Sequence, residues 1–173
     1  MPQPVFILVH PGSLATHAGS HALDDAIREL ETHNGPLVII DGFLSDKMNP
    51  FEFRLLRAFE RAVARGDFVV RLWGCDGGEK PFKNWPGYAS HGIVIDHIHP
   101  DQEVAAAFLA PIVRSHDAIL TGAWATHDGS SGCVNSVGKA MVQAGWPGVY
   151  RISDTALYED EIDGKEEAEE TEE

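Results

Sequence analysis

The sequence has few cysteines and no long apolar run. Its two cysteines, Cys75 and Cys133, have no CxxC spacing, so we do not expect paired structural use and take each as a free thiol. No segment approaches the roughly 20 apolar residues that span a bilayer, and the start lacks the basic and apolar regions of a secretion signal. We therefore expect a cytoplasmic protein with no membrane partner.

Basic residues are also scarce. The chain has 13 Lys and Arg against 27 Asp and Glu, which gives a formal net charge of −14. The linear sequence shows no cluster of Lys and Arg that could neutralise phosphates. We therefore expect no binding to nucleic acid.

The acidic residues are concentrated at the end of the chain. Residues 159–173 contain ten of them and a single lysine, Lys165. Such a segment cannot bury enough apolar surface to offset the entropy lost on ordering. We predict one α/β domain over residues 1–158, followed by a disordered acidic tail over 159–173. The tail would either keep the protein in solution or contact a basic partner.

Short apolar segments alternate with amphipathic ones along the rest of the chain. Strands are predicted over 5–9, 37–41, 68–73, 92–98, 118–124 and 149–153. Strands that are apolar along their whole length imply a parallel sheet covered on both faces. The predicted fold class is α/β, a three-layer Rossmann-like sandwich with a mainly parallel sheet of about six strands.

Helical spacing appears between the predicted strands. A Gly/Ser/His-rich loop is expected after residue 9, before a helix that Asn34-Gly35 ends. Asn49 and Pro50 open the next helix, and Pro111 is expected to kink or shorten the third. In the last helix the residues predicted to face inward are Val134, Val137, Met141 and Val142.

Polar and titratable residues gather just after the predicted strands. In a parallel sheet these positions meet at the carboxyl edge, where ligands bind. The residues are His10, Ser13, Asp41, Asp46, Cys75, Asp76, His97, His99, Asp101, His127, Asp128, Ser130, Ser131, Cys133 and Asp154. We expect a small-molecule ligand at this edge, with Ser13 and Asp76 among the residues that bind it.

The segment from Thr121 to Lys139 is rich in glycine and serine. It lies between a predicted strand and a helix start, where free backbone N–H groups and the helix dipole favour an anion. It is neither a Walker A loop, whose first glycine would fall on Cys133, nor a Gly-x-Gly-x-x-Gly fingerprint. It is either a structural turn or a loop that binds an anionic metabolite or nucleotide through Asp128, Gly129, Ser130, Ser131 and Gly132.

Cys133 is the candidate nucleophile. A helix N-terminus stabilises a thiolate, which is the reactive form of cysteine. His127 or His10 would orient or deprotonate it, with Asp41 or Asp128 in support. The alternative is that Cys133 is a small buried apolar residue.

His97 and His99 lie on the same side of a predicted strand and invite a metal hypothesis. Two imidazoles so placed, with a carboxylate nearby, would suit zinc or another divalent ion. Their spacing matches no specific zinc signature, so we assign no metal and no cofactor.

Four segments carry a resemblance to a known family. They are Leu37-Val-Ile-Ile-Asp41, Ala118-Ile-Leu-Thr-Gly122, Gly132-Cys-Val-Asn-Ser136, and Ala144-Gly145 with Val149 to Asp154. The last three resemble the nucleophile region of isochorismatase-like cysteine hydrolases, and the first is similar to the family strand that ends in the catalytic aspartate. The resemblance implies hydrolysis of amide-like or vinyl-ether substrates, with Cys133 as nucleophile and Asp41 as proton acceptor. The family's catalytic lysine is not matched, because Ile95-Asp96-His97 stands in its place.

Three functions stay open at this stage. The first is binding of a small anionic metabolite or nucleotide at the carboxyl edge, with hydrolysis by Cys133. The second is a non-catalytic interaction protein that binds a basic partner through the tail and an aromatic surface, Trp73, Phe82, Trp85 and Tyr88. The third is a nucleotide-phosphate-binding transferase or glycosidase that uses the Gly/Ser loop. The sequence also leaves open whether the chain forms a homo-oligomer.

Overall fold

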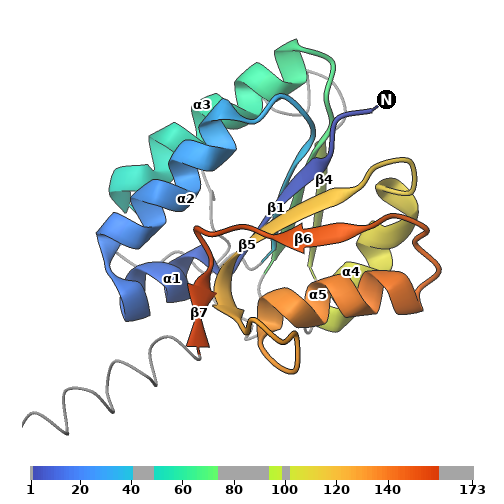
Figure 1. The fold of residues 1–173 in the computed structure, drawn as a ribbon. Coiled ribbons are helices and arrows are strands. Elements are labelled where there is room, and N and C mark those ends of the chain that lie inside the picture. The colour runs from blue at the N-terminus through green and yellow to red at the C-terminus, as the bar shows by residue number, and fades with distance from the viewer. Residues whose placement is uncertain (1, 41–48, 74–93, 99–101, 160–173) are drawn as a thin grey trace, which may run out of the picture.

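A parallel sheet lies between two layers of helices (Figure 1). The computed structural model describes residues 2–40, 49–73, 94–98 and 102–159. The strands are β1 (Val5–Val9), β2 (Leu37–Ile40), β3 (Val69–Trp73), β4 (Val94–Ile98), β5 (Ala118–Ala125), β6 (Tyr150–Ile152) and β7 (Leu157–Tyr158). The three-layer α/β fold and its mainly parallel sheet are therefore confirmed.

The side of the sheet on which successive strands are added changes at β1. The sheet runs β4-β3-β2-β1-β5-β6, with β7 paired to β5, and every pairing among the described strands is parallel. The chain builds outward from β1 through β2, β3 and β4, then returns to place β5 on the other side of β1. Ligands of such sheets bind at this switch point, outside the carboxyl ends of the two strands.

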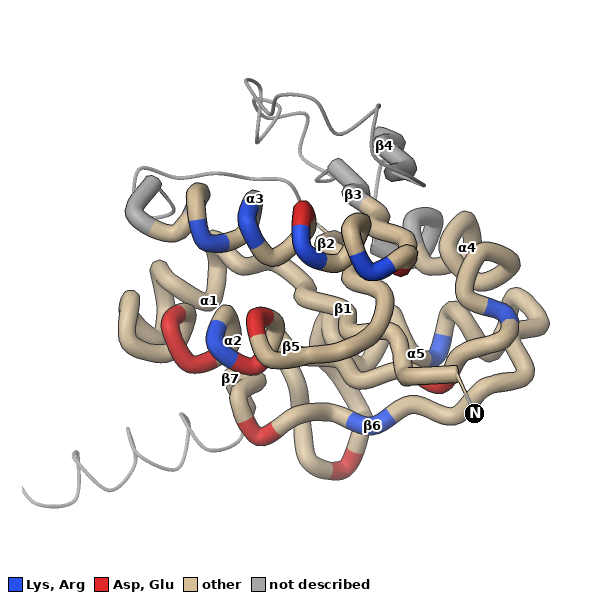
Figure 2. Tube along the Cα trace, turned by 90° about the horizontal axis from the view of Figure 1, so that it is seen from above, with Lys and Arg blue, Asp and Glu red and all other residues tan. Residues whose placement is uncertain are grey.

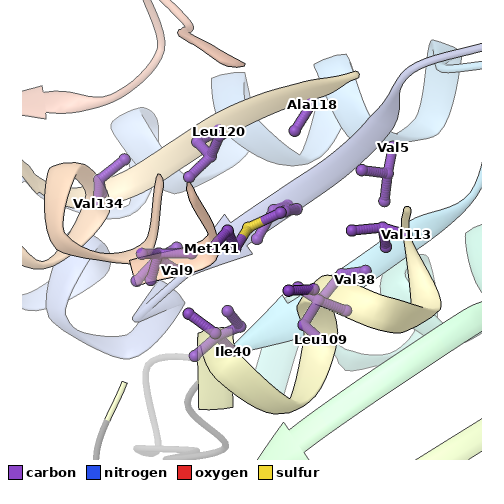
Figure 3. Packing of buried hydrophobic residues seen from close by; sticks show 14 of the residues in the cluster. Val5, Val9, Val38, Ile40, Leu109, Val113, Ala118, Leu120, Val134 and Met141 are labelled. Carbon is purple, nitrogen blue, oxygen red and sulfur yellow. The ribbon is translucent and has the colours of Figure 1, made fainter. Parts of the chain in front are cut away.

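The helices divide the core into two clusters. They are α1 (Pro11–Ala18), α2 (Ser20–Thr32), α3 (Asn49–Ala64), α4 (Gln102–Ile112) and α5 (Cys133–Gln143). Because strand residues alternate in direction, Phe6 and Leu8 of β1 pack with α1, α2 and α3, whereas its three valine and isoleucine residues pack with α4 and α5. Figure 3 shows Val9, Leu120, Val134 and Met141 in the second cluster. Burial on both faces explains why β1 is apolar at every position.

The loop expected after β1 is instead a helix. Residues 11–18 form α1, because Pro11 presets the backbone angle of the first turn and Leu14 and Ala15 are buried against the sheet. By their local preferences alone, Pro11 and Gly12 favour a loop. The apolar face of this short helix is recognisable only once the sheet is present.

Several other details differ from the sequence-based predictions. Helix α2 ends at Thr32 rather than at Asn34-Gly35, and Gly35 has no positive φ; its small size fits a close approach to the carbonyl oxygen of Pro4. Val142 is 50% exposed rather than inward-facing. Pro111, which was expected to kink or shorten α4, lies one residue before the end of that helix. Strand β7 was not predicted, because it has only two residues.

No described helix combines the length and apolar character that a membrane span requires.

Gly122 allows β5 to lie directly against the end of β1. Its φ is +121°, and a Cβ at this position would lie 1.8 Å from the carbonyl oxygen of Val9. Val9 and Gly122 are register partners in the two strands. Any side chain at position 122 would therefore force β5 away from β1.

We expect Gly122→Ala to lower the free energy of unfolding by roughly 2–5 kcal/mol, through backbone strain together with overpacking. Gly145→Ala is the matched control, since Gly145 has φ +93° but no atom within 4 Å of the added Cβ. The control should cost only about 1–2 kcal/mol of strain. Urea denaturation of both variants measures the difference, and equal losses would contradict the steric explanation.

Candidate functional site

The carboxyl ends of β1 and β5 form the centre of the candidate site. Helix α1 begins at Pro11, just after β1, and α5 begins at Cys133 after a seven-residue loop. The first N–H groups of a helix have no partner within that helix. The switch point is therefore flanked by two helix N-termini, one on each face of the sheet.

His10 makes the turn from β1 into α1. It is buried, 8% exposed, and is the one described non-glycine residue with a positive φ, at 50°. Its N–H donates to the carbonyl oxygen of Ile40 at 2.9 Å, and its own carbonyl oxygen accepts the N–H of Leu14 at 3.1 Å. These two bonds hold His10 at the sheet edge in a backbone conformation that few side chains adopt.

The loop between β5 and α5 is tied to the first turn of α5. Asn135, 4% exposed, accepts the N–H of Thr126 through Oδ1 at 2.9 Å. The Thr126 hydroxyl donates to the carbonyl oxygen of Ser131 at 3.2 Å and accepts the Ser131 N–H at 3.3 Å. The loop thus closes on itself before the helix begins.

Asp128 occupies the tip of this loop. Its Oδ1 accepts both the hydroxyl of Ser130, at 2.7 Å, and the N–H of Ser130, at 2.9 Å. These bonds, with the hydroxyl first, lower the pKa of Asp128 below its ordinary value. The ionised carboxylate of Asp128 therefore accepts the Ser130 N–H, which the sequence analysis had assigned to a ligand. The Thr126 hydroxyl likewise accepts the Ser131 N–H. An anion at this end of the sheet would need the N–H groups that start α5 instead.

Gly132 brings the chain back to the end of β5. Its φ is +99°, and a Cβ there would lie 2.4 Å from the carbonyl oxygen of Trp124. As the N-cap of α5 it has no side chain to satisfy the first N–H groups of the helix. Cys133 follows, half-buried against the core cluster shared with α4. The α5 start is consequently uncapped and held close to β5.

Aromatic rings border the site on both sides. The exposed His127 ring stacks on Tyr158 of β7, with centroids 4.0 Å apart and planes inclined by 14°. His17 of α1 lies against Trp124 of β5, at 4.8 Å between centroids. Tyr158 and Trp124 were not among the predicted site residues. For Tyr158, the one indication in the sequence was the apolar triplet Ala156 to Tyr158 just before the acidic tail.

The structure places part of the predicted site at one stretch of the edge. His10 and Ser13 lie at the start of α1, whereas Asp128 to Gly132 lie between β5 and α5, and Cys133 begins α5. Register relates the two groups, since Val9 pairs with Gly122 and Gly132 approaches Trp124, two residues further along β5. The predicted residues outside the described part of the chain are Asp41, Asp46, Cys75, Asp76, His99 and Asp101, together with Phe82, Trp85 and Tyr88.

A second polar cluster escaped the sequence-based prediction. The hydroxyl of Ser153 donates to Oε2 of Glu29 at 2.6 Å, and the hydroxyls of Thr121 and Thr155 share a hydrogen bond of 2.7 Å. The Ser153 and Thr155 hydroxyls lie 3.0 Å apart, which joins the two pairs. This network links α2 to the segment after β6, and no periodic pattern marks it.

The described residues contain no group of three or more His, Cys, Asp or Glu that could hold a metal ion. His97 belongs to β4, but its side chain lies outside the described part of the structure, as does all of His99.

No protein-family model, curated protein or solved structure matches this chain. The functional argument therefore depends on the chemistry of the site itself.

We expect Asn135→Ala to destabilise the protein by about 1–3 kcal/mol, because it leaves the buried N–H of Thr126 without an acceptor. Gln143→Ala removes an exposed amide from the other end of α5 and should change stability by no more than about 0.5 kcal/mol. Chemical denaturation compares the two variants. A loss for Asn135→Ala as small as that of the control would mean that this hydrogen bond does not hold the loop.

We also expect Asp128→Asn to lower stability at pH 7 but not in acid. The lowered pKa of Asp128 in the folded state means that its carboxylate stabilises the fold above the ordinary aspartate pKa of about 3.9. This contribution is lost as the pH falls through the folded value. Urea midpoints of wild type and variant should therefore converge below that pH. A difference independent of pH would contradict the assignment, and Asp154→Asn serves as an exposed control.

Proposed function

We propose that this protein binds a small anionic metabolite at the switch point between β1 and β5, and that Cys133 acts there as the nucleophile of a hydrolase. The observation that supports this proposal is the uncapped start of α5. Gly132 provides no capping side chain, and Cys133 is the first residue of the helix. A helix N-terminus favours both a bound anion and a thiolate.

The proposed reaction is acyl transfer through sulfur. The Cys133 thiolate attacks the carbonyl carbon of an amide-like substrate, and the unpartnered N–H groups at the α5 start donate to the developing oxyanion. The C–N bond then breaks, and the leaving nitrogen takes a proton from the general acid. Water hydrolyses the resulting thioester, releasing the carboxylate product and the thiol.

Three residues compete for the role of acid and base. The resemblance to isochorismatase-like cysteine hydrolases implies Asp41, which directly follows β2, the strand that pairs with β1. His10 is buried at the end of β1, whereas His127 is exposed and stacked on Tyr158. The buried position of His10, and the place of Asp41 directly after β2 in the sequence, favour these two residues over His127.

The Gly/Ser loop as a nucleotide-phosphate cradle has less support. The N–H groups of Ser130 and Ser131 already bond within the loop, and the ionised Asp128 would repel a phosphate there. A single carboxylate at the start of α5 needs fewer N–H donors than a nucleotide phosphate does. The proposed ligand is therefore a small carboxylate or its amide.

The first test is the rate of alkylation of Cys133 at pH 7 in the Cys75→Ala variant. We expect it to exceed the rate for free cysteine by at least roughly tenfold. The Cys133→Ala variant reports Cys75 in the same assay and serves as the control.

A Cys133 thiol that reacts like an ordinary one would remove the hydrolase proposal. Carboxylate binding at the α5 start would then be tested separately, by titration of Cys133→Ala with small carboxylates. A reactive thiol would justify a screen of amide substrates with Cys133→Ser as the inactive comparison.

A further inference from the structure

Helix α3 carries a row of four arginines. Arg54, Arg57, Arg61 and Arg65 account for four of the chain's 13 basic residues, and all lie in or just after α3. Their spacing of three, four and four residues puts them on one side of the helix. Figure 2 shows the basic positions in line along α3. The linear sequence suggested no basic cluster, because helical spacing distributes this one over twelve positions.

Two of these arginines are already neutralised. Arg54 forms ion pairs with Asp24 and, at 2.6 Å, with Glu31, both on the neighbouring helix α2. Arg65 pairs with Asp67 and donates to the carbonyl oxygens of His33 and Gly35. These contacts hold α3 against the rest of the fold and are unavailable to a partner.

Arg57 and Arg61 are the available charges. Both are exposed, and neither forms an ion pair with another residue that the structure describes. Phe53, one turn before Arg57, is 71% exposed. Together Phe53, Arg57 and Arg61 form a surface that we call the α3 face, and its chemistry suits an acidic peptide with a few apolar groups.

We propose that the α3 face binds the acidic C-terminal segment of the same chain, residues 160–173. This segment holds nine acidic residues and one lysine, and its single large apolar residue is Ile162. It is the most acidic stretch of the sequence, and its charge is opposite to that of Arg57 and Arg61. No other segment offers the α3 face so complementary a partner.

The fold brings the two within reach of each other. Strand β7 runs parallel to β5, so the chain leaves it toward the carboxyl edge of the sheet. Helix α3 follows β2, so its first turn lies at that same edge (Figure 1). Helix α2 lies between, which puts α3 about two helix spacings, roughly 20 Å, from β7. Fourteen residues span up to about 46–50 Å, so the segment can cross that distance.

Covalent attachment makes this weak contact effective. Exposed ion pairs contribute little individually, about 0–1 kcal/mol each, and salt screens them. A short connection raises the local concentration of the segment to about the millimolar range, which a separate acidic partner rarely reaches. The contact should therefore form within one molecule and weaken sharply as salt is added.

The test is zero-length carbodiimide cross-linking of the full chain carrying Arg57→Lys and Arg61→Lys, which keep the charge but supply amines. Peptide mapping quantifies links between the introduced lysines and residues 160–173. The native Lys139, exposed on α5 across the sheet, is the internal control. We expect at least roughly fivefold more links at α3 than at Lys139 in about 10 mM salt, and loss of the excess in about 500 mM salt.

Two outcomes would overturn the proposal. Equal yields at α3 and at Lys139 would mean that the segment does not select the α3 face. Links found mainly in covalent dimers would mean that it binds a second copy. As an independent check, ending the chain after Glu159 should shift the backbone amide signals of α3 in NMR spectra. Arg57→Glu with Arg61→Glu in the full chain should move the same signals toward those of the shortened chain, and unchanged spectra would contradict docking.

Discussion

The backbone contact between β1 and β5 is the constraint on which the rest of the carboxyl edge depends. Gly122 permits it, since a Cβ there would meet the carbonyl oxygen of Val9. Because the two strands meet so closely, the turn at His10 and the loop before Cys133 both start from neighbouring points. The two helices that follow then present their N-termini on opposite faces of one switch point. A sheet opened at this contact would separate the groups that the proposed site needs.

Hydrogen bonding within the β5–α5 loop decides where negative charge can bind. Thr126, Ser131 and Asn135 satisfy one another, and Asp128 takes the N–H and hydroxyl of Ser130. A loop with many glycines and serines is therefore less available to an anion than its composition suggests. The N–H donors of the loop bond within the loop, whereas the first N–H groups of α5 have no capping side chain. The expected ligand position therefore moves toward Cys133.

Charge is separated within the molecule as well as along the sequence. Acidic side chains of α2 face basic ones of α3, and the ion pairs of Arg54 with Asp24 and Glu31 join the two helices. The arginines beyond these pairs stay exposed in a chain whose net charge is strongly negative. An acidic segment joined to such a domain has a complementary surface nearby, so the tail and the α3 face are best considered together.

Much of the fold follows from the sequence alone, because local patterns are sufficient for it. Apolar runs such as Val5–Val9 and the helical spacing of Leu23, Ala26, Ile27 and Leu30 each reflect burial against a sheet. Alternation of these elements predicts a parallel sheet, and a parallel sheet predicts which edge holds His10, Ser13 and Cys133. These conclusions need only the rules of periodicity and handedness.

Tertiary structure decided what depends on contacts between distant segments. Helix α1 forms because the sheet buries Leu14 and Ala15, and two-residue β7 exists because β5 offers an unpaired edge. The role of Gly122, the pairing of Asn135 with Thr126, and the link from Glu29 to Ser153 each join residues that no local pattern relates. The spacing of apolar side chains determines which face of each helix or strand is buried. Steric fit and hydrogen-bond partners between elements are determined only when the chain has packed.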